Sequence, residues 1–198
     1  MDLLAAHTLV VEQPWSAGKI LLRTRYHADV YDKRDGHLAT VGERSTSRLA
    51  RPVRLTHLSG NTPFKLTVNR PDGVTLLTVD KGISVLRPRI RVSGMDGHEL
   101  GSIERDDRKS YPITDRTGAT IGAFDFPSGR FTAADGTEVA TMEHRVIARR
   151  AGRRVGRIVL HVHPNASGPL RVLVIATVLA LDVVRGNGTA LDNAILWN

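Results

Sequence analysis

The chain has 198 residues, a formal net charge of +8 at pH 7 and no cysteine. Its length suits one globular domain over residues 1–198, and a hydrophobic content of 41% is too high for a disordered chain. A charged content of 24% excludes a polytopic membrane protein, and the lack of cysteine excludes disulfides, thiolate metal sites and a cysteine nucleophile.

The N-terminal segment MDLLAAHTLVVEQ carries an acid where a signal peptide carries Lys or Arg, and its apolar stretch is short. We therefore expect a cytoplasmic protein. Residues 19–31 then alternate between apolar and polar side chains, which predicts a strand with one buried and one solvated face. Residues 83–92 alternate in the same way, with Leu86, Ile90 and Val92 opposite Arg87, Arg89 and Arg91.

A turn phrase recurs along the chain: Asp-Gly or a similar pair, two or three further residues, then a small apolar stretch that ends in charge. Asp-Gly tolerates the positive φ angles of a tight turn, so each copy favours a β-hairpin. Six hairpins give about twelve strands, and the spacing between turns leaves no room for crossover helices, which predicts an antiparallel meander. The copies are DGHLATVGER (35–44), DGVTLLTVDK (72–81), DGHELGSIER (96–105), TGATIGAFDF (117–126), DGTEVATMEH (135–144) and AGRRVGRIVL (151–160).

The segment 172–184 breaks this pattern, because it is apolar on every side except at Thr177 and Asp182. It predicts a helix over about 171–185, which at about 20 Å is too short to cross a hydrocarbon core of roughly 30 Å and must be buried in protein. A barrel of about twelve strands leaves room for a helix along its axis. The predicted fold is therefore a mainly β, about twelve-stranded antiparallel barrel closed around an apolar C-terminal helix. The residues assigned to the core of this helix are Val174, Val178, Leu181 and Asp182.

The serial hairpins followed by an apolar helix resemble the Tubby C-terminal-like superfamily, in particular its LURP-one-related and phospholipid-scramblase branch. The resemblance covers about residues 7–188 and rests on DGHELGSIER, on FTAADGTEVATMEHR and on VLVIATVLALDVV with its late acid, Asp182. It implies a twelve-stranded barrel around a C-terminal helix. For function, it implies phosphoinositide binding and membrane tethering as in Tubby proteins, or lipid scrambling as in scramblases. Scramblases carry an acidic calcium-binding stretch before the final helix, but this chain has HVHPNASGPL (161–170) there, so calcium dependence does not carry over.

Two arginine clusters are the candidate sites for an anionic ligand. Guanidinium groups form bidentate, charge-assisted hydrogen bonds with phosphate, and a strand places alternate residues about 7 Å apart on one face. The alternative for each cluster is a solvated outer face that keeps the sheet soluble. The first cluster is Arg87, Arg89 and Arg91; the second, around the last predicted turn, is Arg149, Arg150, Arg153, Arg154 and Arg157.

Other polar residues are given structural interpretations. His161 and His163 share a strand face with spacing that also serves metal sites, but we interpret them as surface histidines and expect no metal. We interpret Asp182 as a structural anchor that Arg185 could pair with, the alternative being a ligand or proton site. The chain has no GxSxG elbow, Walker loop, HExxH or GxGxxG, so we expect no enzyme, no catalytic residue and no cofactor.

The sequence therefore favours a non-enzymatic binding or scaffold module that binds anionic phospholipid or phosphoinositide at a membrane surface. Such a protein would be cytoplasmic and peripheral to the membrane, with no transmembrane segment. The alternative is an adaptor for a protein or nucleic acid with no lipid role. Nucleic acid is the weaker of the two partners, because aromatic residues, which stack on single strands, make up 5% of the chain.

Overall fold

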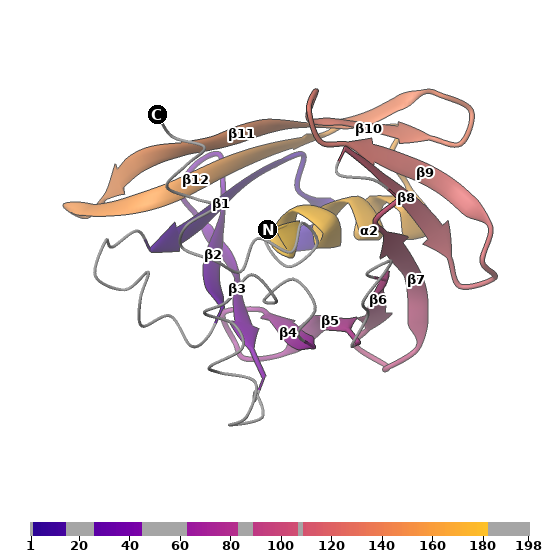
Figure 1. The fold of residues 1–198 in the computed structure, drawn as a ribbon. Coiled ribbons are helices and arrows are strands. Elements are labelled where there is room, and N and C mark those ends of the chain that lie inside the picture. Colours follow the sequence, from indigo (N-terminus) through magenta and orange to yellow (C-terminus); the bar gives the residue numbers. More distant parts are fainter. Residues whose placement is uncertain (1, 15–25, 45–62, 83–88, 107–108, 182–198) are drawn as a thin grey trace.

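The computed structural model describes residues 2–14, 26–44, 63–82, 89–106 and 109–181. Within these ranges, twelve strands form one closed antiparallel barrel in which sequential strands pair and β1 also pairs with β12 (Figure 1). The barrel confirms the predicted meander. The elements are η1 (Leu3–Ala5), β1 (Thr8–Pro14), β2 (His27–Asp32), β3 (His37–Glu43), β4 (Phe64–Asn69), β5 (Thr75–Lys81), β6 (Arg89–Gly94), β7 (Glu99–Glu104), β8 (Ser110–Asp115), β9 (Thr120–Asp125), β10 (Arg130–Ala133), β11 (Glu138–Arg150), β12 (Arg153–Val162) and α2 (Gly168–Leu179).

All six predicted turn phrases lie at hairpin turns, which join β2 to β3, β4 to β5, β6 to β7, β8 to β9, β10 to β11 and β11 to β12. The turn aspartates fix local backbone geometry. Asp135, for example, accepts a hydrogen bond from the backbone N–H of Thr137 at 2.9 Å, and this bond lowers the pKa of the Asp135 carboxyl. The next residue, Gly136, has a φ of +84°, which a residue with a side chain adopts at a cost.

Helix α2 runs inside the ring of strands, and every residue from Leu173 to Leu179 is buried (Figure 1). Val174 and Val178 are 0% and 1% exposed, and Leu181, just after the helix, is 4% exposed. Thr177 is also buried, and its hydroxyl donates to the carbonyl of Leu173 at 2.7 Å. The prediction of an apolar helix as the core of the barrel is confirmed.

The bounds of this helix differ from the prediction. It begins at Gly168, with Pro169 in its first turn, and it ends at Leu179 with Ala180 as its C-cap. The first turn lies at the mouth of the barrel, where Leu170 and Arg171 are half-buried, so a search for a continuous apolar run starts too late. A proline in the first helical turn loses no hydrogen bond, because the N–H there has no partner within the helix. Residues 182–185, including Asp182, lie outside the described residues.

Polar side chains fasten both ends of α2 to the barrel. At its first turn, the guanidinium of Arg171 donates to the carbonyls of Leu4 at 2.6 Å and Ala6 at 2.7 Å. At its last turn, the hydroxyl of Tyr26 donates to the carbonyl of Leu179 at 2.7 Å. These contacts supply partners for backbone groups that helix ends and coil leave unpaired.

Two glycines let the strands approach the helix closely. A Cβ atom placed at Gly101 on β7 would lie 2.8 Å from Cδ1 of Leu173, and one at Gly122 on β9 would lie 2.9 Å from Cδ1 of Leu170. Both would also meet the backbone carbonyl of the neighbouring strand, at 2.2 Å and 2.5 Å. The helix and the strands are therefore fitted to each other at these positions, and a side chain there would push them apart.

We expect Leu179→Asp to prevent folding, because the side chain is 1% exposed and an unpaired carboxylate there costs several kcal/mol. The measurement is soluble yield and thermal melting. Val146→Asp introduces the same charge at a side chain that is 55% exposed, and should melt as the wild type does. A folded Leu179→Asp protein with wild-type melting would contradict the buried position of α2.

Candidate anion-binding surface

The two predicted arginine clusters lie on opposite sides of the barrel. Arg89 and Arg91 are on β6, whereas the second cluster spans the end of β11 and the start of β12. In the closed strand order, β6 is six positions from β12 in either direction. One flat surface cannot contact both clusters at once, so they are separate candidate sites. Arg87 lies outside the described residues.

The β6 cluster points outward, as predicted, but acidic residues lie beside it. Ile90 and Val92 are buried, whereas Arg89 and Arg91 alternate with them and are exposed. Nε of Arg89 donates to Oγ of Ser102 at 3.0 Å. The strand register places Glu104 opposite Arg89 and Asp80 opposite Arg91. The neighbouring acids reduce the positive potential of this face, which makes it the weaker anion site.

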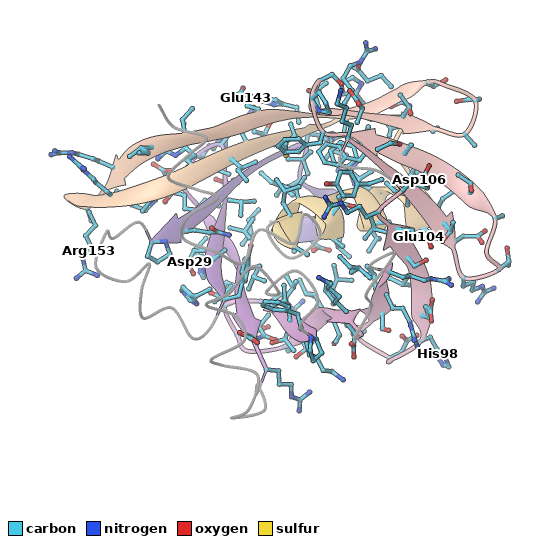
Figure 2. All side chains as sticks on the ribbon, in the orientation of Figure 1. Asp29, His98, Glu104, Asp106, Glu143 and Arg153 are labelled. Carbon is cyan, nitrogen blue, oxygen red and sulfur yellow. The ribbon has the colours of Figure 1, made fainter. Side chains whose placement is uncertain are left out.

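The second cluster lies on a hairpin that is longer than the neighbouring strands of the barrel. Its turn residues, Ala151 and Gly152, have φ angles of +46° and +77°, as in the tight turns that suit the twist of paired strands. The register places Arg149 opposite Arg154 and Arg150 opposite Arg153. The β11–β12 hairpin extends beyond the neighbouring strands (Figure 1), and Arg153 at its tip points away from the barrel (Figure 2).

Two arginines of this cluster are held by acids, in a set of contacts that we call the Glu12 clamp. The carboxylate of Glu12 on β1 is buried and pairs with both Arg150 and Arg157, the latter at 2.7 Å. Arg150 also pairs with Asp35 at 2.8 Å and lies 3.9 Å above the ring of Tyr31. Hydrogen bonds to Glu12 and Asp35 raise the pKa of Arg150. The guanidiniums of Arg150 and Arg157 thus already have acidic partners within the protein. Their role in ligand binding stays a prediction.

The other three residues form what we call the tip arginines: Arg149, Arg153 and Arg154. All three are exposed, and none of their guanidiniums has a hydrogen bond or ion pair with another described residue. Two large aliphatic side chains on the same hairpin are exposed as well, Val146 by 55% and Ile147 by 48%. The hairpin therefore presents positive charge at its tip and an exposed aliphatic side chain on each of its two faces.

The two histidines point outward, as predicted, and each lies near an acid of the neighbouring strand β11. Nε2 of His161 is 3.1 Å from Oε1 of Glu143, and Nε2 of His163 is 3.9 Å from Oε1 of Glu138. Sequence inspection missed these acids because strand pairing, not local sequence, brings them close. No group of three or more potential metal ligands occurs among the residues that the structure describes.

Sequence analysis also missed a buried cation, Lys81, at the end of β5. The side chain is fully buried, and burial lowers the pKa of its ammonium group from 10.5 to about 8, with Arg105 contributing further. The alternation in β5 contains the signal that could have found it, because Lys81 shares the inner face with Leu77 and Val79. Because its side chain is buried, Lys81 does not belong to the candidate anion-binding surface.

Comparisons with known proteins support the fold. No protein-family model matches the chain, and no curated protein matches its sequence. A solved X-ray structure of a protein from Arabidopsis thaliana is similar, with a TM-score of 0.50 and 12% identity, over 91% of this chain and 93% of that chain. At this identity the similarity shows a shared fold, in agreement with the predicted closed antiparallel barrel. In the part of the chain that the structure describes, no helix is long and apolar enough to cross a membrane.

We expect Glu12→Gln to lower the free energy of unfolding by about 1–3 kcal/mol, because Arg157 loses its buried counter-charge and Arg150 keeps only its exposed acidic partner, Asp35. Glu138→Gln is the matched control, since its partner, Arg130, is 59% exposed and such surface pairs contribute less than about 1 kcal/mol. Chemical denaturation measures both. Equal losses in the two variants would show that the clamp does not stabilise the base of the hairpin.

Proposed function

We propose that the protein is a non-enzymatic binding module for anionic phospholipid, and that the tip arginines contact the headgroups at a membrane surface. The observation that carries the proposal is the group of three exposed arginines at the end of a projecting hairpin, without an acid paired to them among the described residues. Arg149 and Arg154 lie directly opposite each other on one face of the hairpin, where like charges repel, so an anion that bridges them lowers the free energy of the protein. Phosphate suits guanidinium because both groups bond in a bidentate manner.

The shape of the hairpin supports a surface rather than a small soluble anion. Arg153 points away from the barrel at the hairpin tip (Figure 2), and the strand register places Arg149 and Arg154 next to the same turn. Val146 and Ile147 add exposed apolar area beside them, which suits the boundary between headgroups and acyl chains. Each basic residue near an anionic membrane contributes about 1 kcal/mol, so three give weak, reversible and salt-sensitive binding.

The same charge would also attract a polyanion of another kind. A nucleic acid contacts cations through its phosphates, with a strong dependence on salt. The stacking platforms that hold single strands are not a feature of this hairpin, whose exposed large side chains are aliphatic. The oligonucleotide arm of the experiment below therefore decides between the two phosphate sources.

The test is sedimentation with vesicles of phosphatidylcholine alone or mixed with phosphatidylserine or phosphatidylinositol 4,5-bisphosphate. We expect binding to the anionic vesicles only, weakening as salt shortens the screening length to about 8 Å or less. Arg149→Gln, Arg153→Gln and Arg154→Gln together should abolish binding. The control variant, with Arg87, Arg89 and Arg91 replaced by Gln, loses the same charge and should keep most of the binding, because Arg89 and Arg91 lie on the opposite side of the barrel.

Equal loss of binding in the two triple variants would indicate general electrostatic attraction and contradict a site at the hairpin. Absence of binding to anionic vesicles at low salt, by wild-type protein with an intact melting transition, would exclude the lipid role. Tighter binding to a single-stranded oligonucleotide than to the vesicles would indicate that the tip arginines bind nucleic acid instead of lipid.

A further inference from the structure

The half of β11 nearest its turn has an open backbone edge. Strand β10 pairs with β11 only from Glu138 to Thr141, and the last backbone bond on that side runs from the N–H of Met142 to the carbonyl of Gly129, at 2.7 Å. Beyond Met142, β12 is the one described strand that pairs with β11, and it does so on the other edge. Among the described strands, residues 146–150 thus form an edge on an otherwise closed barrel.

The hairpin register shows which backbone groups face this edge. Arg150 and Arg153 flank a two-residue turn and therefore form a hydrogen-bonded pair, so the pairs alternate from there along the strands. Arg149 and Ile147 belong to the non-bonded pairs, and their N–H and C=O groups point away from β12. Four backbone groups consequently remain available to a further strand, and no described residue bonds to them.

We propose that this edge binds an extended, acidic peptide segment of a partner protein, which adds as a further strand beside β11. The two faces of the edge specify the partner by charge and polarity. Arg149 and Arg154 lie on one face together with Ile147, and all three are exposed. Val146, also exposed, and Ala148, half-buried, lie on the other face, which carries Arg150 and Arg153 nearer the turn. The matching strand alternates Glu or Asp with Val or Ile, since successive residues point to opposite faces.

Charge also argues against a second copy of this chain as the occupant. Pairing of two β11 edges would bring two sets of tip arginines together, and like charges on adjacent strands are destabilising. Exposed edges in native proteins are commonly protected by charged side chains against such pairing. Here the protecting charges have one sign, so they admit an acidic strand and reject a basic one. This proposal does not depend on lipid binding, because it rests on backbone groups that a membrane does not need.

The probe is a short acetylated peptide of alternating glutamate and valine, with fluorescence anisotropy as the readout. We expect binding that protects the amides of Ile147 and Arg149 from hydrogen exchange and leaves other β-barrel amides unchanged. The matched control peptide has the same sequence with every backbone nitrogen N-methylated, which keeps the charge and removes the donors on both of its edges. It should bind about tenfold more weakly or worse.

The matched protein variants are Ile147→Pro, which removes a donor at the open edge, and Ile147→Thr, which keeps it. Ile147→Pro should weaken peptide binding by about tenfold, whereas Ile147→Thr should retain it. Equal binding of the two peptides, or peptide binding without protection of the Ile147 and Arg149 amides, would overturn the proposal. The protection measurement uses wild-type protein and decides the matter even if Ile147→Pro fails to fold.

Discussion

The fold depends on one constraint: a helix that is apolar on every side must be covered on every side. Helix α2 has no face that could lie against water, because Leu173 to Leu179 are all buried. A single sheet or another helix could cover only part of that circumference, whereas a closed barrel covers all of it. The constraint is mutual, since a twelve-stranded barrel would be hollow without the helix. Gly101 and Gly122, where a side chain would strike the helix, show how closely the two are fitted.

The sequence predicted features that depend on local chemistry and missed those that depend on closure. Asp-Gly turns and the apolar run at 172–184 each depend on residues that are close together in the sequence. The meander and the central helix could therefore be predicted. The Glu12 clamp joins β1 to both strands of the final hairpin through residues far apart in sequence, and it exists because β1 pairs with β12. For the same reason, the sequence could place five arginines around one turn but could not show that Arg150 and Arg157 are already paired.

The unequal lengths of neighbouring strands create the candidate functional surface. Strand β1 ends at Pro14, opposite Val155, and β10 pairs with β11 only as far as Thr141. No described strand therefore lies beside the tip of the last hairpin. Charges inside the barrel wall can be neutralised by residues opposite them, as Asp80 and Glu104 are placed for the β6 arginines. At the tip no such neighbour exists among the described strands. The open edge and the tip arginines are thus two results of the same overhang, and each offers a different kind of contact.

Hydrogen exchange of the α2 amides measured by NMR tests the central claim most directly. If the helix fills the closed barrel, its backbone can exchange only when the barrel opens, so the amides of Val174 to Val178 should exchange with the free energy of global unfolding. Their protection should then fall in step with global stability as denaturant is added. Exchange of these amides through a much smaller opening free energy, while the strands remain protected, would show that α2 leaves the barrel independently and would contradict the account.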